Sequence, residues 1–165
     1  MKIREMIPDD RTSVLEIYRQ GIDSGLATFR TSYPTWEEWN ASHKNVCRYV
    51  AADHDLIIGF AAVSLVSSLP HYFGVWEVMV YVHEAHRYCG AGTMLMRKLM
   101  EEAQKHGCWT LYSSIMSDNT HSIRLHEKCG FRTIGYRERI AKDRYGNWKD
   151  TTIMEYRFPD KEIAR

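Results

Sequence analysis

The chain alternates between two patterns of apolar and polar residues. In one pattern apolar residues recur at every second position, which is typical of strands; in the other they recur at every third or fourth position, which is typical of amphipathic helices. The first pattern predicts strands at 2–6, 48–53, 56–64, 76–82, 109–115, 132–140 and 151–158. The second predicts helices at 11–20, ended by Gly21, and at 35–44, 92–105 and 119–129. This order predicts an α/β (α+β) fold in which a mixed sheet of six to seven strands is flanked by about four helices.

The middle of the chain has the clearest pattern. The strand at 76–82 carries one row of apolar side chains, which consists of Trp76, Val78, Val80 and Val82. The helix at 92–105 carries an apolar stripe, which consists of Leu95, Met96, Leu99, Met100 and Ala103. No repeat, low-complexity segment or linker-like run divides the chain, and we expect one domain over residues 1–165.

Composition narrows the class of partner. The 165 residues are 44% hydrophobic and 26% charged, with a formal net charge of +1. This balance gives no general attraction to nucleic acid or to an anionic membrane surface. The longest apolar stretches are far too short to span a membrane, and the charged residues Lys2, Arg4 and Glu5 leave no room for a signal peptide. We therefore expect a cytoplasmic protein without nucleic-acid or membrane partners.

The cysteines and histidines indicate no metal centre. The four cysteines form no Cys-x-x-Cys pair, so neither a zinc ribbon nor a dithiol redox motif fits. The segment from His83 to His86 is one residue short of the His-Glu-x-x-His spacing that places two imidazoles on one helix face. We expect four reduced thiols and no metal.

Two glycines mark the loop before the helix at 92–105, in the sequence Arg-Tyr-Cys-Gly-Ala-Gly at 87–92. Glycines allow a backbone to approach a ligand closely, and the N–H groups at a helix N-terminus favour a phosphate or diphosphate. Leu95 stands where a dinucleotide fingerprint needs a third glycine, and no Gly-Lys-Ser/Thr triplet of a P-loop occurs. Two alternatives remain: a site for another diphosphate ligand, and a turn that only begins the helix.

Five segments follow one another in an order found in a known family. They are the Arg-x-x-Gly-x-Gly loop, the segment from Asn119 and Ser122 to the Leu-His-Glu-Lys-Cys-Gly-Phe run at 125–131, and the segments at 77–82, 29–31 and 145–150. Together they resemble the GNAT family of N-acetyltransferases, and within it the phosphinothricin and methionine sulfoximine acetyltransferase branch. The resemblance covers residues 3–158. It implies a GNAT fold, acetyl-CoA as cosubstrate and a small-molecule amine as acceptor.

The resemblance also implies roles around the acetyl group. Glu77 stands at the position of the general base that takes a proton from the amine. The backbone of Val80, Tyr81 and Val82 is expected to hydrogen-bond the pantetheine arm, with the N–H of Val80 donating to the thioester oxygen. Asn119, followed by Ser122, matches the residue that meets the pantetheine amide. The diphosphate is expected to bind the loop residues Arg87, Tyr88, Cys89, Gly90, Ala91, Gly92 and Thr93.

Two of these roles have a plain structural alternative. His126 stands where many relatives carry a tyrosine that protonates the departing thiolate, and it is alternatively a packed helix residue. Glu77 is alternatively a solvated or ion-paired glutamate on a strand.

On the substrate side, Phe29, Arg30 and Thr31 align with the substrate loop of the branch. Trp148 either walls the amine site or packs in the core or in a dimer. A further stretch ahead of the base, His71, Tyr72 and Phe73, departs from the branch, because Phe73 holds the place of an arginine that relatives usually carry. Arg30 or His71 then contacts a substrate carboxylate, or the acceptor has no carboxylate.

The function expected is transfer of the acetyl group of acetyl-CoA to the primary amine of a small amino-acid-like substrate, by direct attack in a ternary complex. The alternatives are the same chemistry on a polyamine, an antibiotic amine or a peptide N-terminus, and a non-catalytic acyl-CoA-binding module. Relatives are commonly dimers, so we expect a homodimer.

Overall fold

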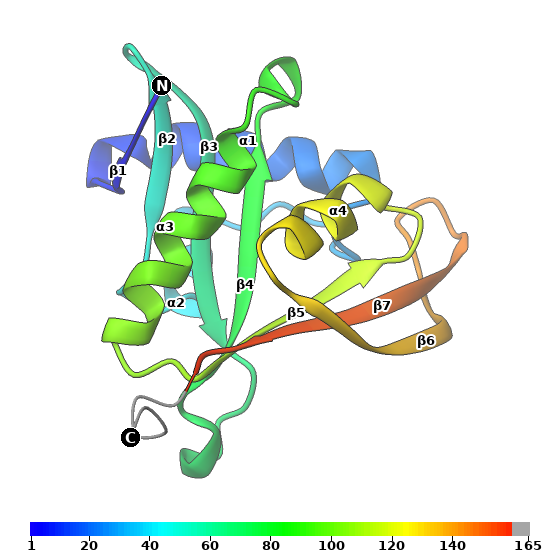
Figure 1. The fold of residues 1–165 in the computed structure, drawn as a ribbon. Coiled ribbons are helices and arrows are strands. Elements are labelled where there is room, and N and C mark those ends of the chain that lie inside the picture. The colour runs from blue at the N-terminus through cyan, green and yellow to red at the C-terminus, as the bar shows by residue number, and fades with distance from the viewer. Residues whose placement is uncertain (160–165) are drawn as a thin grey trace, which may run out of the picture.

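The computed structural model describes residues 1–159, and its elements follow the predicted order (Figure 1). The strands are β1 (Lys2–Glu5), β2 (Tyr49–Asp53), β3 (Leu56–Leu65), β4 (Val75–Val82), β5 (Thr110–Met116), β6 (Arg132–Lys142) and β7 (Trp148–Arg157). The helices are α1 (Arg11–Ser24), α2 (Trp36–Ser42), α3 (Ala91–Lys105) and α4 (Thr120–Lys128). Short 3-10 turns lie at Pro8–Asp10, Pro70–Tyr72 and Glu84–His86. The predicted mixed α/β class is confirmed; residues 160–165 of the expected domain lie outside the described residues.

Across the described residues the strands form one seven-stranded sheet in the order β1-β2-β3-β4-β5-β7-β6. β4 and β5 are parallel, and every other neighbouring pair is antiparallel. β4 pairs with β3 from Trp76 to Val82, but it pairs with β5 only from Val75 to Glu77. Beyond Glu77 the two parallel strands therefore separate, and Figure 1 shows them running apart.

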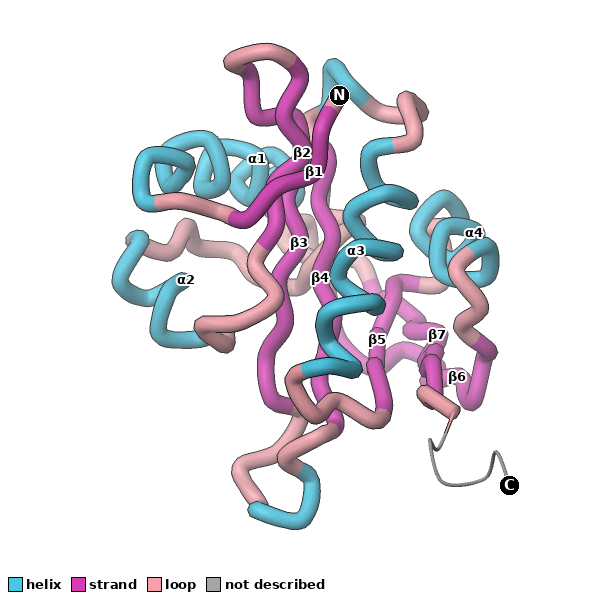
Figure 2. The backbone as a smooth tube through the Cα atoms, turned by 60° about the vertical axis from the view of Figure 1, so that its left-hand side comes forward, coloured by secondary structure: helices cyan, strands magenta, loops and turns pink. Residues whose placement is uncertain are grey.

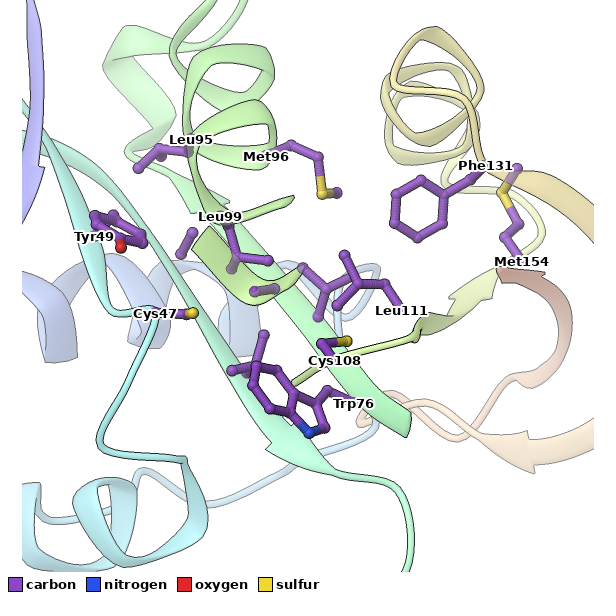
Figure 3. Packing of buried hydrophobic residues seen from close by; sticks show 14 of the residues in the cluster. Cys47, Tyr49, Trp76, Leu95, Met96, Leu99, Cys108, Leu111, Phe131 and Met154 are labelled. Atoms are coloured by element: carbon purple, nitrogen blue, oxygen red, sulfur yellow. The ribbon is translucent and has the colours of Figure 1, made fainter. Parts of the chain in front are cut away.

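Helices cover both faces of this sheet (Figure 2). On one face α1 and α2 bury Ile17 and Trp39 against Phe60 of β3. On the other face α3 buries Leu95 and its apolar stripe in a cluster shown in Figure 3, which also includes Trp76, Leu99, Leu111, Phe131 and Met154. Successive residues of β3 and β4 belong to opposite clusters, as the two-residue period of a strand requires. The predicted row of Trp76, Val78, Val80 and Val82 lies on one face of the sheet and packs in the same cluster as the apolar stripe of α3.

The prediction that Gly21 ends the first helix is wrong. α1 continues through Gly21 to Ser24 and ends at Gly25, whose φ of +64° is the left-handed conformation common after a helix. Gly21 is buried, and the ring of Tyr81 fills the space beside it. The glycine is therefore explained by a close contact inside the helix and not by termination.

The last hairpin has a shorter turn than its pattern predicts. β6 extends to Lys142 and β7 begins at Trp148, because the carboxylate of Asp143 closes the turn. It accepts hydrogen bonds from the backbone N–H groups of Tyr145 and Asn147, both at 2.9 Å. This is the local turn chemistry of an aspartate.

Three further features bear on the expected class of protein. Within residues 1–159 no helix has both the length and the apolar character needed to cross a bilayer. In the same residues no group of three or more histidine, cysteine or acidic side chains is arranged to hold a metal ion. All four cysteines are free.

Candidate functional site

A cleft of about 940 Å³ opens where β4 and β5 separate. Residues 77–82 of β4 and 113–115 of β5 form its walls, and the segment 26–30 after α1 closes one end. The start of α3 and one side of α4 line the other end. Among the described residues that line the cleft, Glu77 is the only carboxylate. The two ends therefore differ in charge, and we call them the acceptor end, around Glu77 and residues 26–30, and the cationic end, around α3 and α4.

Glu77 lies at the branch point of the sheet. It is the last residue of β4 that pairs with β5, opposite Tyr112. Burial raises the pKa of the Glu77 carboxyl above its usual value, and no ion pair with another described residue opposes this shift. A half-buried carboxylate that faces a cleft without a partner has the properties of a general base.

Two tyrosines stand beside Glu77 at the acceptor end. The rings of Tyr18 and Tyr81 meet edge-on, with centroids 5.1 Å apart. Burial raises the pKa of both hydroxyls; the charge of Glu77 acts in the same direction, and the charge of Arg30 opposes it. Glu77 and Arg30 therefore both lie close enough to these two rings to act on them electrostatically, and both line the cleft.

The segment that carries Arg30 is tied to the rest of the cleft. The hydroxyl of Tyr81 donates to the carbonyl of Ala27 at 3.4 Å, and the amide of Asn119 donates to the carbonyl of Leu26 at 3.3 Å. The N–H of Arg30 donates to the hydroxyl of Thr28 at 3.2 Å. The guanidinium of Arg30 forms no ion pair with the described residues and is available to a ligand.

The wall formed by β4 offers free backbone groups. Since β5 leaves β4 after Glu77, the edge of β4 from Val78 to Val82 pairs with no other strand of the described residues on this side. An extended chain of amides can hydrogen-bond such an edge as an added strand does. Val80, Tyr81 and Val82 all line the cleft, and their hydrogen bonds to a pantetheine arm stay a prediction.

The start of α3 offers a further set of free N–H groups. Gly90, at a φ of +88°, precedes the helix, and no side chain caps it. The first N–H groups of an uncapped helix have no partner within the helix and favour an anion. Arg87, Tyr88, Gly90, Ala91, Gly92 and Thr93 line the cleft here; Cys89 is exposed and lies outside its lining.

α4 brings Asn119, Ser122 and His126 to the cleft. Asn119 precedes the helix, and its side-chain oxygen accepts the N–H of Ser122 at 3.3 Å. His126 is buried, with Nδ1 2.7 Å from the carbonyl of Ser122 and Nε2 without a partner among the described residues. Burial lowers the pKa of His126, so the ring is neutral near pH 7. In that state Nδ1 donates and Nε2 accepts, which is the arrangement of a proton acceptor; the acid role stays a prediction.

Five residues expected at the substrate lie outside the lining of this cleft: Thr31, His71, Tyr72, Phe73 and Trp148. Phe73 packs edge-on against Trp109, with ring centroids 4.8 Å apart. Trp148 is half exposed on β7 and lies under the cations of Arg139 and Lys142, at 5.3 and 5.0 Å from the ring centroid. Arg30 and His71 were the two residues expected to replace the arginine that relatives carry. Of these two, the structure brings Arg30 to the lining of the cleft.

Several lining residues had no distinguishing pattern in the sequence. Tyr18 lies on the buried face of α1, and His43 follows α2, where its ring stacks on Trp39 at 4.3 Å. Further examples are Ser42, Ser64, His86, Ser113, Ser114, His121, Arg124 and Lys128. For Arg124 and Lys128 the sequence did hold one indication: residues four positions apart lie on the same face of a helix.

Comparison with known proteins identifies the class. Residues 13–131 match the model of the acetyltransferase (GNAT) family. The chain belongs to the acetyltransferase (GNAT) family, and its fold and family are those that the sequence indicated.

Individual relatives agree with this assignment. The chain is 31% identical over 106 residues to an L-methionine sulfoximine/L-methionine sulfone acetyltransferase of Salmonella typhimurium, covering 64% of this chain and 61% of that protein. It is 27% identical over 162 residues to a phosphinothricin N-acetyltransferase of Streptomyces viridochromogenes, covering 96% and 88%. The chain thus matches less than two thirds of the length of the first of these relatives. Among solved structures, yncA of Salmonella typhimurium, described as an acetyltransferase with its cofactor acetyl-CoA, superposes with a TM-score of 0.89 at 26% identity and covers 98% of both chains.

Proposed function

We propose that this protein transfers the acetyl group of acetyl-CoA to the amine of a small amino-acid-like molecule. The observation that carries the proposal is the position of Glu77. An unpartnered carboxylate with a raised pKa lies where β4 and β5 separate, in the same cleft as a free strand edge and an uncapped helix start. A module that only binds an acyl carrier needs the last two features but has no use for the first.

The residues of the cleft fit the parts of acetyl-CoA, which supplies an acetyl group activated as a thioester. The N–H groups from Gly90 to Thr93 suit its diphosphate, and the free edge of β4 suits the amides of its pantetheine arm. Along this path the acetyl group is expected between Val80 and Glu77. The N–H of Val80 is the donor expected for the thioester oxygen.

Proton transfer from the amine is the task of Glu77. An amine reaches the cleft mostly as an ammonium ion, and it attacks only after it loses a proton. The Glu77 carboxylate takes that proton, directly or through one water. The nitrogen then forms its bond to the acetyl carbon as the carbon–sulfur bond breaks, and coenzyme A leaves as a thiolate that takes up the second proton lost by the nitrogen. The raised pKa of Glu77 makes it a stronger base than an exposed glutamate.

The acceptor end favours a substrate that carries both charges of an amino acid. Its ammonium would lie near Glu77, and its carboxylate would contact the guanidinium of Arg30. The rings of Tyr18, Tyr81 and Phe29 leave an apolar wall for the substrate side chain. Two relatives named for methionine sulfoximine, methionine sulfone and phosphinothricin support this class of acceptor. The cytoplasmic location and the homodimer stay predictions.

A thiol-release assay with acetyl-CoA across a panel of amines tests the proposal. The panel contains methionine sulfoximine, methionine sulfone and phosphinothricin, with spermidine, an aminoglycoside and a short peptide for the alternative acceptors. Acceptor-dependent release of coenzyme A with the first three, and little with the last three, is expected. Binding of acetyl-CoA without release for any amine would support the non-catalytic alternative instead.

A further inference from the structure

We propose that Arg124 and Lys128 bind the 3′-phosphate on the adenosine of coenzyme A, and that this contact selects acetyl-CoA over acyl carriers that lack the phosphate. The inference rests on the proposed function and extends it to a part of the cosubstrate far from the reacting atoms. It begins from the cationic end of the cleft, whose lining contains more positive groups than a diphosphate site requires.

The residues concerned occupy one side of α4. His121, Arg124 and Lys128 are spaced three and four residues apart, so they follow one another along a single helix face. All three line the cleft. The rise from residue 121 to 128 is roughly 10 Å, so this face spans about two turns of α4.

Two observations place this face close to the diphosphate loop. A Cβ on Gly92 would lie 3.4 Å from Cδ2 of Leu125, so the start of α3 and the middle of α4 approach closely. The ring of His121 lies edge-on to that of Tyr88, with centroids 4.7 Å apart. α4 therefore carries Arg124 and Lys128 beside the loop that is expected to bind the diphosphate, and both line the cleft.

The charges of these two side chains have no partner among residues 1–159. Arg124 and Lys128 are exposed, and neither forms an ion pair with the described residues. Some cations elsewhere on the surface are paired: Arg19 pairs with Glu16 at 2.8 Å and Lys98 with Glu102 at 2.7 Å. Unpaired cations that line one end of a cleft repel one another, and an anionic ligand relieves that repulsion.

The chemistry of coenzyme A offers an anion of the right kind at this place. Its diphosphate has a backbone site at the start of α3, whereas its 3′-phosphate is a second, separate dianion on the ribose. A phosphate monoester is well matched by the planar fork of an arginine together with a lysine ammonium. The competing assignment is that Arg124 and Lys128 bind the diphosphate itself. The two assignments predict different affinities for a ligand that lacks the 3′-phosphate.

Calorimetric titration with coenzyme A and with 3′-dephospho-coenzyme A separates them. The wild type is expected to bind coenzyme A at least about tenfold more tightly, since one charge-assisted contact is worth 1.4 kcal/mol or more. In the variant R124A/K128A this preference should fall to about unity, through weaker binding of coenzyme A alone. The variant K2A/R11A removes the same charge from exposed positions outside the cleft and should keep the wild-type preference.

Three results would overturn the inference. One is equal affinity of the wild type for the two ligands, and another is an unchanged preference in R124A/K128A. The third is equal weakening of both ligands in that variant, which would place the two side chains on the diphosphate. Failure of both ligands to bind the wild type would overturn the proposed function as well, whereas the first three results leave it intact.

Discussion

The ring of Tyr81 occupies the space that a side chain on Gly21 would need. A Cβ at position 21 would lie 2.3 Å from Cε1 of this ring, well inside contact distance. The same ring stacks on Phe60 with centroids 5.5 Å apart and lies edge-on to Tyr18, so it has little room to move. Because Gly21, Tyr18 and Tyr81 all line the cleft, the packing of α1 on β4 also sets the shape of the acceptor end.

The variant Gly21→Ala should therefore lose stability. Alanine is favoured over glycine inside a helix by about 1 kcal/mol, but overpacking a buried site costs about 1–3 kcal/mol. We expect a lower free energy of unfolding in a urea titration and a raised KM for the acceptor. Gly135→Ala is the control, because no atom lies within 4 Å of a Cβ there. A Gly21→Ala variant more stable than wild type would contradict this account of the contact.

Arg30→Ala should weaken the acceptor and spare the cosubstrate. If the guanidinium contacts the substrate carboxylate, its loss removes a charge-assisted contact of about 1.5–3 kcal/mol and raises KM for methionine sulfoximine by roughly 10- to 100-fold. The decarboxylated analogue should be a poor substrate for wild type and variant alike. His71→Ala, a change outside the lining of the cleft, should leave the activity with methionine sulfoximine and with the decarboxylated analogue unchanged. Equal losses for the two amines in Arg30→Ala would show that Arg30 does not contact the carboxylate.

The pH dependence of stability should depend on Glu77. Because burial raises its pKa above 4.5, the folded state holds a proton that the unfolded state has lost at pH values between the unfolded and folded pKa. Stability therefore falls as pH rises through that window, and Glu77→Gln removes this loss. The melting temperature of the variant relative to wild type should be higher at pH 8 than at pH 4. The opposite trend would mean that the native protein favours the ionised carboxylate.

Local patterns predicted the parts of the fold that depend on local burial. The row from Trp76 to Val82 and the stripe of α3 follow the strand and helix periods because each buries one face on the sheet. Gly21 was misinterpreted because its reason is the ring of Tyr81, a contact from a distant strand that no local pattern contains.

The site residues also fall into those that the sequence predicted and those whose position depends on a distant contact. The loop at 87–92 was predicted by its motif and Glu77 by the family resemblance; Glu77 and every residue of the loop except Cys89 line the cleft. The stretch from His71 to Phe73 does not, because its course depends on a tertiary contact. Phe73 packs on Trp109, and a Cβ on the adjacent Gly74 would lie 2.2 Å from the same indole. Aligning residues with a family position does not predict such a contact.

The most direct test of the account is the variant Glu77→Gln, with acetyl-CoA binding and turnover measured on the same preparation. The account predicts that the Kd for acetyl-CoA stays within about twofold of wild type, because the free strand edge and the start of α3 are unchanged. It predicts that kcat falls by roughly 10²- to 10⁴-fold, the usual contribution of a general base. Turnover at the wild-type rate with intact binding would contradict the assignment of Glu77 as the base.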